Sequence, residues 1–276
     1  MSQQVVCKNC GNSFSGKYCN ICGEKIYTEK DRSVRHILSE GFHFVTHLDG
    51  TLVTTLKTFF TSPGKFSLDY CNGLRKKYFK PVSFFLLLVI LYLLFPKFNA
   101  LNSIPHQHVL NPLYGSYALR KALEVIQAKH LTDAQLGEAF GHTSEKISKF
   151  LLFIIIPVMA CFSWAMGFKK RKYYYDNFIF SIEATSFFIL CGFLIFPFIL
   201  LVLHKAFPVL PYLSDTQIII TILSIFTLYM IVAAKRFFRF NWWQSILYTL
   251  LYIFIMAMFI QFVYKFILFF ITIHLI

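Results

Sequence analysis

The chain has 276 residues, of which 57% are hydrophobic, 19% aromatic and only 14% charged. Soluble domains carry about 25% charged and about 45–50% apolar residues, so this composition excludes a soluble protein for most of the chain. The net charge of +14 suits either a nucleic-acid partner or an anionic membrane surface, and the positions of the basic residues must decide between the two.

Two CxxCG motifs mark the first 27 residues, which are small, polar and too short to build an apolar core. Structural zinc sites use four tetrahedral thiolates, and the CxxC spacing lets two sulfurs reach one ion from a tight turn. We therefore predict a zinc ribbon over residues 1–27 with one Zn²⁺ held by Cys7, Cys10, Cys19 and Cys22. Unmetallated cysteines and a redox pair are the alternatives. The N-terminus lacks a secretory signal, which predicts that it stays in the cytoplasm.

Residues 28–77 mix charges with apolar side chains at helical spacing, first over 34–48 and then over 52–60. These amphipathic helices are too polar to span a bilayer, so they either lie among the headgroups or pack on the membrane helices. Ser62-Pro63-Gly64 is expected to break the second helix. His43 and His47 share a helix face with Asp49 nearby, and the polar edge of a helix is favoured there over a metal site.

Five apolar stretches follow, and a spanning helix needs about 20 such residues. We predict a transmembrane bundle over 78–276 with spans at 78–98, 149–168, 178–203, 216–234 and from 242 past 264. The last stretch, 242–276, is read as one long tilted helix because no turn signal interrupts it. The polar interval 99–148 is predicted to be an exterior loop with short helices at 117–129 and 133–140, and His106 and His108 are expected in plain loop.

Lysine and arginine gather in three segments, 75–80, 169–172 and 235–239. With five spans all three lie on one side of the membrane, and cytoplasmic loops carry the basic excess. The pattern predicts a cytoplasmic N-terminus and an exterior C-terminus. It also explains the net charge by topology, so nucleic acid is an unlikely partner.

Several residues are expected at the cytoplasmic interface of the bilayer: Arg75, Lys76, Lys77, Tyr78, Trp242 and Trp243. Anionic lipid headgroups are the natural partners of the basic ones, and tryptophans favour the headgroup level. General anchoring by positive charge is the alternative reading.

Glu183 lies inside the third predicted span. A carboxylate within a membrane is costly and is a functional candidate by default. The favoured alternative is a simple anchor, in which Glu183 pairs with Lys169, Lys170 or Arg171 at the interface. The sequence contains no phosphate-binding loop, nucleophile elbow or zincin helix.

Several motifs resemble a bacterial domain-of-unknown-function family (number thirty-six sixty-seven) of membrane proteins with an N-terminal zinc ribbon. They are the two CxxCG knuckles, the Pro-Gly step at Ser62-Pro63-Gly64, and the run from Gly73 to Pro81, which is similar to the family's GxRxxYxxP signature. The segment Tyr175-Asp176-Asn177-Phe178 is also similar, but the family often has Glu-His where this chain has Asp176-Asn177. The resemblance implies a fold and a location, and it implies no activity.

Together these patterns predict an all-α membrane protein with about five transmembrane helices, preceded by amphipathic helices and a small zinc ribbon. The function they favour is non-enzymatic: a scaffolding or regulatory protein of the bacterial inner membrane whose ribbon meets a cytoplasmic protein. The alternatives are a small transporter or permeability factor that uses Glu183 and, third, an intramembrane enzyme. The identity of the partner and the oligomeric state have no signature in the sequence.

Overall fold

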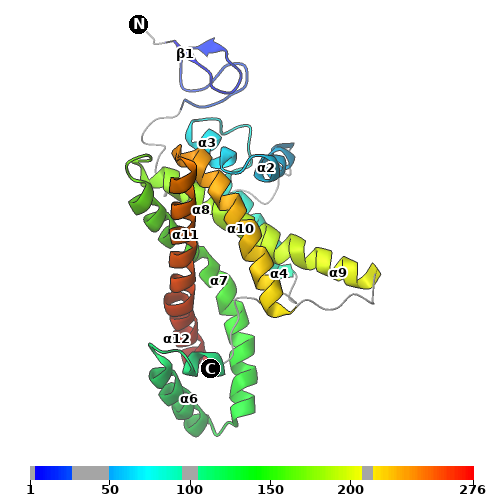
Figure 1. Ribbon diagram of the computed structural model, residues 1–276, viewed down its shortest axis with the longest axis vertical. Coiled ribbons are helices and arrows are strands. Elements are labelled where there is room, and N and C mark those ends of the chain that lie inside the picture. Colours follow the sequence, from blue (N-terminus) through cyan, green and yellow to red (C-terminus); the bar gives the residue numbers. More distant parts are fainter. Residues whose placement is uncertain (1–3, 27–49, 95–104, 207–213) are drawn as a thin grey trace. The chain divides into compact units, whose positions relative to one another are not determined.

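The structure, a computed structural model, describes residues 4–26, 50–94, 105–206 and 214–276. Two short strands, β1 (Val5–Val6) and β2 (Ser13–Phe14), pair antiparallel with Val5 opposite Phe14. The remaining named elements are helical (Figure 1): α2 (Gly50–Thr61), α3 (Lys65–Cys71), α4 (Pro81–Leu94), α5 (Pro105–Val109), α6 (Gly115–Lys129), α7 (Asp133–Gly167), α8 (Tyr174–Phe188), η2 (Ile189–Ile195), α9 (Phe196–Ala206), α10 (Asp215–Phe238), α11 (Trp242–Met258), η3 (Phe259–Tyr264) and α12 (Lys265–Leu275). The predicted helix over 34–48, with His43, His47 and Asp49, lies outside the described residues.

The chain divides into two compact units, one formed by residues 1–92 and 156–251 and the other by 93–155 and 252–276. The first unit holds the ribbon, α2, α3, α8 and α10, and the second holds α5, α6 and α12. Each unit has its own buried residues and is described separately below.

Four helices in the described part of the chain are long and apolar enough to cross a membrane: Phe150–Gly167, Tyr174–Leu203, Thr216–Phe238 and Trp242–Leu275. They confirm the all-α membrane fold that the composition predicts. The helix from Trp242 runs without a turn through a π-helical segment, η3, to Leu275, so the reading of one long final helix is correct.

The predicted first span, 78–98, is described as α4, which has 14 residues. At a rise of 1.5 Å per residue α4 is about 21 Å long, against about 30 Å of hydrocarbon. Positions 95–98 lie outside the described residues.

The second predicted span is part of a longer element than expected. A single 35-residue helix, α7, joins the predicted helix at 133–140 to the span. No glycine or proline cluster separates the polar and apolar halves, and Pro157 lies inside the helix without ending it. The sequence prediction of a loop boundary near residue 148 was therefore wrong, because a change of polarity does not by itself interrupt a helix.

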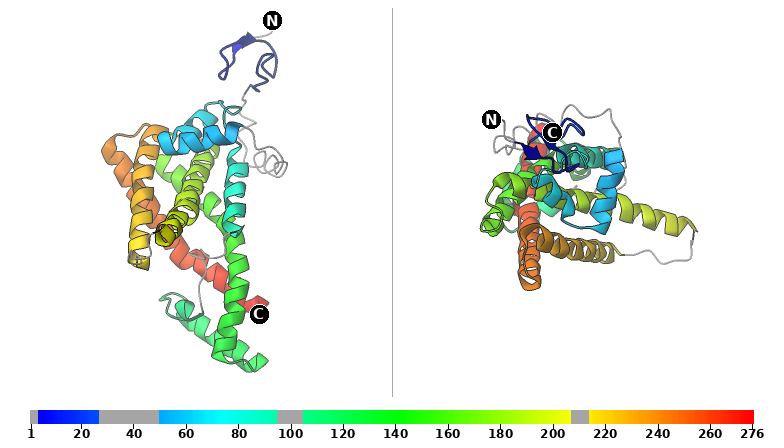
Figure 2. Two further views of the ribbon diagram at one scale, coloured as in Figure 1. Left: turned by 90° about the vertical axis from the view of Figure 1, so that its right-hand side faces the viewer. Right: turned by 90° about the horizontal axis from the view of Figure 1, so that it is seen from above.

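The amphipathic segment packs on the helices of the first unit. Phe59 of α2 is fully buried, and its ring lies 4.9 Å from that of Phe84 in α4. The Thr55 hydroxyl accepts a 2.9 Å hydrogen bond from the amide of Phe79. Figure 2 shows α2 running crosswise to α10. As predicted, α2 ends at Thr61, just before Ser62-Pro63-Gly64.

Helix α8 is the central element of the first unit. Every residue from Tyr175 to Phe187 is buried, including Asp176 and Glu183. The polar side chains of this span therefore face protein, which is where intramembrane polar groups are tolerated.

The second unit is held by an aromatic cluster that includes Tyr114, Phe140 and Phe269. His108 lies in this cluster, fully buried, and its Nδ1 is 2.9 Å from the Tyr114 hydroxyl. The expectation of plain loop around His106 and His108 was wrong, because both belong to the short helix α5.

Candidate metal centre and buried carboxylate site

The two CxxCG motifs fold into two equivalent turns. The amide of Gly11 donates to the carbonyl of Cys7 at 2.9 Å, and the amide of Gly23 donates to that of Cys19 at 2.8 Å. Both glycines have positive φ, +76° and +66°, a conformation that residues with a Cβ rarely adopt. The glycine in each motif therefore closes a turn that presents two sulfurs to the same point.

The four sulfurs of Cys7, Cys10, Cys19 and Cys22 lie within 4.8 Å of one another. The separations are 3.5 Å between Cys7 and Cys22 and 3.6 Å between Cys10 and Cys19. A disulfide needs about 2.05 Å. Tetrahedral coordination with metal–sulfur bonds of about 2.3 Å puts the sulfurs about 3.8 Å apart. The spacing suits one metal ion, so the four residues could hold a metal together.

The backbone favours the thiolate form of at least one ligand. The amide of Cys22 donates to the sulfur of Cys19 and lowers the pKa of this thiol to about 6, against a desolvation effect in the opposite direction. A thiolate is the form that binds metal. Cys7 and Cys19 are buried with Phe14 in a core too small to hold the ribbon folded by itself.

The outer surface of the ribbon carries three large apolar side chains. Val6, Tyr18 and Ile21 are 61%, 60% and 70% exposed. Ile21 lies in the second CxxC turn, and Tyr18 immediately precedes it. These side chains offer apolar area that a partner protein could bury.

Glu183 occupies a site quite different from the predicted interfacial ion pair. Its side chain is 1% exposed, and its Oε1 accepts hydrogen bonds from the amide of Gly64 at 2.8 Å and from the hydroxyl of Tyr229 at 2.8 Å. Its Oε2 accepts from the amide of Ser67 at 2.8 Å and from the Ser67 hydroxyl. The predicted pairing with Lys169, Lys170 or Arg171 is therefore wrong.

These bonds join three helices. The amides come from the start of α3, where helical N–H groups lack intrahelical partners, and the phenol comes from α10. Gly64 has φ +76°, and a Cβ there would meet the carbonyl oxygen of Ala233 at 2.4 Å. Arg236 Nη1 donates to the carbonyl of Pro63. We call this arrangement of Gly64, Ser67, Glu183 and Tyr229 the carboxylate clamp.

A second polar group lies at the start of α8. Arg171 Nη1 is 3.7 Å from Asp176 Oδ2. Asn177 is buried, its Nδ2 donates to the carbonyls of Arg171 and Tyr173, and its Oδ1 accepts from Ser163. The pair Asp176-Asn177 thus stabilises the entry to α8.

The expected interface residues differ in exposure. Lys76, Lys77, Trp242 and Trp243 are exposed, and Arg75 is half-buried. Tyr78 is 3% exposed and donates to Asp69 at 2.7 Å, so it does not face headgroups.

Sequence reasoning missed Ser67 and Tyr229 as partners of Glu183. The available signal was the Ser-Pro-Gly break, which predicts a helix start with free amides close to an intramembrane acid. Nothing local connects that start to a residue 116 positions away.

Residues 49–93 match a family model described as "Protein of unknown function (DUF3667)". No curated protein and no solved structure matches the chain. The matched region contains α2, α3 and the first 13 residues of α4, together with Gly64 and Ser67 of the carboxylate clamp. The match agrees with the family that the sequence motifs predict, and it covers the Pro-Gly step and the run from Gly73 to Pro81.

Proposed function

We propose that this protein is a non-enzymatic scaffolding or regulatory protein of the bacterial inner membrane, whose cytoplasmic ribbon is folded by zinc and binds a protein partner. The observation that supports it best is that Val6, Tyr18 and Ile21 are exposed on a head whose four cysteines could hold one metal ion. Such a site has no open coordination position for catalysis, which is typical of structural zinc.

Zinc is the metal that we assign to the site. Four cysteine thiolates in a tetrahedral arrangement are the donor set of structural zinc sites and of iron–sulfur proteins. The sulfur separations of 3.5 and 3.6 Å suit a single ion rather than a cluster. Metal binding then supplies folding free energy that the ribbon's small core lacks.

The carboxylate clamp argues against the transport alternative. A transport site needs a carboxylate that exchanges its partners with substrate or water, whereas both oxygens of Glu183 accept hydrogen bonds from the protein. We therefore treat Glu183 as a positioning residue of the bundle.

Metal analysis tests the zinc assignment. Purified protein should contain about one zinc per chain, and Cys19→Ser/Cys22→Ser should lose it. The control Cys161→Ser/Cys191→Ser alters two cysteines outside the ribbon and should keep it. Equal metal content in the two double variants would refute the assignment.

Affinity purification from native membranes tests the partner. We expect proteins that co-purify with the wild-type chain to be lost from Tyr18→Ser/Ile21→Ser. They should be retained by Leu119→Ser/Leu123→Ser, which removes two exposed apolar side chains from α6 instead. The proposal fails if both variants capture the same proteins in the same amounts.

A further inference from the structure

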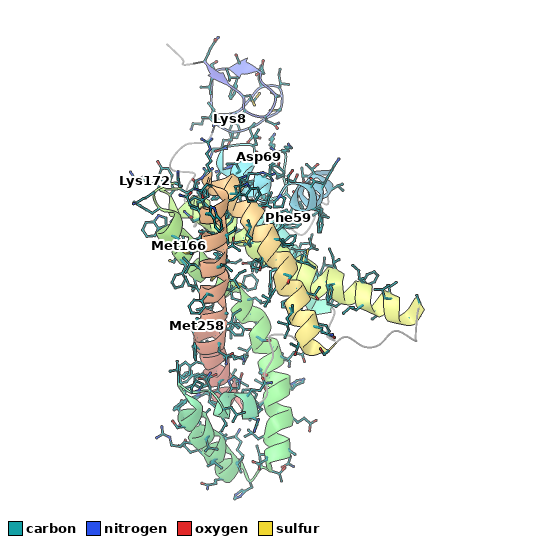
Figure 3. The ribbon with its side chains drawn as sticks, in the orientation of Figure 1. Lys8, Phe59, Asp69, Met166, Lys172 and Met258 are labelled. Carbon is teal, nitrogen blue, oxygen red and sulfur yellow. The ribbon has the colours of Figure 1, made fainter. Side chains whose placement is uncertain are left out.

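Three basic segments that are distant in the sequence come together at one end of the first unit. Arg75 Nη2 donates to the hydroxyl of Tyr175 at 3.0 Å, which joins segment 75–80 to the start of α8. Arg171 Nε donates to the carbonyl of Phe237 at 3.1 Å, which joins segment 169–172 to segment 235–239. Figure 3 shows Lys172 at this end, as well as Asp69 of α3.

The arginines and lysines of this end have different environments. Arg75, Arg171 and Arg236 are half-buried and bond to groups of the protein. Lys169, Lys170 and Lys172 are exposed, as is Arg239. The arginines therefore hold the segments together, and the other residues leave their charge facing outward.

The turn that carries the three lysines is well defined. The amides of Lys170 and Arg171 both donate to the carbonyl of Gly167 at 2.9 Å and close the end of α7. Trp164 Nε1 donates to the carbonyl of Lys172 at 2.9 Å. The lysines thus project from a fixed loop.

Aromatic side chains place this end at the level of lipid headgroups. All three tryptophans of the chain, Trp164, Trp242 and Trp243, are exposed here. Lys235 Nζ lies 3.7 Å from the centre of the Trp242 ring. Tryptophan is enriched where the hydrocarbon meets the headgroups.

Two acidic side chains described next to these segments have other partners. Asp69 is buried and takes Lys65 and Tyr78 as partners, and Asp176 is buried beside Arg171. A positive surface that adjoins membrane-spanning helices complements the negative surface of a bilayer rich in acidic lipid.

We propose that Lys169, Lys170, Lys172 and Arg239 form a binding surface for the headgroups of anionic phospholipids. The surface belongs to the bundle, so it does not depend on the ribbon or on its protein partner. The proposal differs from general anchoring in two ways. These four residues form the binding surface, and the surface binds anionic headgroups more strongly than zwitterionic ones.

Tryptophan fluorescence tests the proposal directly, since Trp164 bonds to Lys172 and Trp242 lies against Lys235. The full chain is reconstituted in phosphatidylcholine vesicles with rising fractions of brominated phosphatidylglycerol or brominated phosphatidylcholine, which quench tryptophans that they contact. The wild-type chain should be quenched at a lower fraction of the anionic lipid, and the preference should weaken in high salt.

Two matched double variants decide the outcome. Lys169→Gln/Lys170→Gln should reduce the preference by up to about fivefold for each lysine at low ionic strength. Lys121→Gln/Lys146→Gln, which removes two lysines of the second unit, should leave it unchanged. Lys169→Arg/Lys170→Arg keeps the charge and should keep the preference. Equal quenching of the wild-type chain by both lipids, or equal preference in the two glutamine variants, would overturn the proposal.

Discussion

At the scale of single residues, Glu183 shows how a carboxylate is tolerated inside an apolar helix. A charged residue at the centre of a membrane helix costs about 2.5–3.5 kcal/mol on insertion scales. Here two backbone amides and two hydroxyls donate to its oxygens, so the charge is hydrogen-bonded rather than left in hydrocarbon. The same bonds satisfy amides at the start of α3, which have no intrahelical acceptor.

Glu183→Gln should destabilise the protein. The new amide nitrogen would face a backbone N–H of Gly64 or Ser67, donor against donor, and an unsatisfied buried donor costs about 1–3 kcal/mol. We expect a lower thermal unfolding midpoint in detergent and a lower abundance in membranes. Glu124→Gln, at an exposed position of α6, is the control and should change the free energy of unfolding by less than about 0.5 kcal/mol. Normal stability with lost cellular function would instead favour the transport alternative.

Gly64→Ala should also be destabilising. The residue has φ +76°, which costs an L-residue about 1–2 kcal/mol, and its Cβ would meet the carbonyl oxygen of Ala233 at 2.4 Å. Gly137→Ala is the matched control, because Gly137 lies inside α7 with open space around it. Alanine there should be neutral or stabilising by about 0.5–1 kcal/mol. Unfolding midpoints of the two variants measure the contrast, and equal values would contradict the role given to Gly64.

At the scale of elements, the short helix α5 introduces a titratable group into the aromatic core of the second unit. Burial lowers the pKa of His108 from 6.5 to about 4, with the charge of Lys265 acting in the same direction. The unfolded chain therefore binds a proton at a higher pH than the folded chain does. Stability from this group is complete above the unfolded pKa and is lost as the pH falls from about 6.5 towards 4.

The test compares unfolding midpoints at about pH 7.5 and about pH 5, between which the unfolded histidine takes up its proton. His108→Phe keeps an aromatic ring but cannot titrate, so it should lose less stability on acidification than the wild-type chain. His106→Phe alters the exposed neighbour on α5 and should keep the wild-type pH response. Identical pH responses in all three proteins would exclude His108 as the source.

Patterns confined to one element predicted much of this structure. The cysteine spacing predicted the cluster of four cysteines, because each CxxCG turn is built from five adjacent residues. Apolar runs identified α8, α10 and α11, since the length needed to cross a bilayer is a local property. The break after α2 followed from Ser62-Pro63-Gly64. Helix α7 was divided wrongly, because helical backbone continues through a change from polar to apolar side chains.

Contacts between distant elements could not be predicted in this way. The partners of Glu183 lie between 46 and 119 positions away in the sequence. Which helix start meets the carboxylate depends on how α3, α8 and α10 pack, and a single sequence does not specify that packing. Proximity in the sequence therefore points to segment 169–172 as the partner of Glu183. In the structure, Arg171 of this segment bonds to the carbonyl of Phe237 and pairs with Asp176 instead.

At the scale of the whole molecule, contacts among the basic segments constrain the number of membrane crossings. Arg75 bonds to Tyr175, so the chain must cross the membrane an even number of times between these residues. Only α7 qualifies by length among the described helices of that interval, and the apolar α4 is the other candidate. This contact therefore favours α4 as a crossing helix despite its 14 described residues. Arg171 and Phe237 are likewise separated by two apolar helices.

Five crossings predict opposite locations for the two ends of the chain. Reporter fusions at Lys172 and Lys235 should give cytoplasmic signals, because the basic segments favour that side. Fusions near Asn111 and Ser214, and at the C-terminus, should give exterior signals. Reversing the charge of Lys169 and Lys170 is a control. It should lower the fraction of chains inserted in this orientation, while the two groups of fusions still report opposite sides of the membrane. A cytoplasmic C-terminus together with an exterior Ser214 would mean that the helix from Trp242 to Leu275 does not cross, and the count would fall to four.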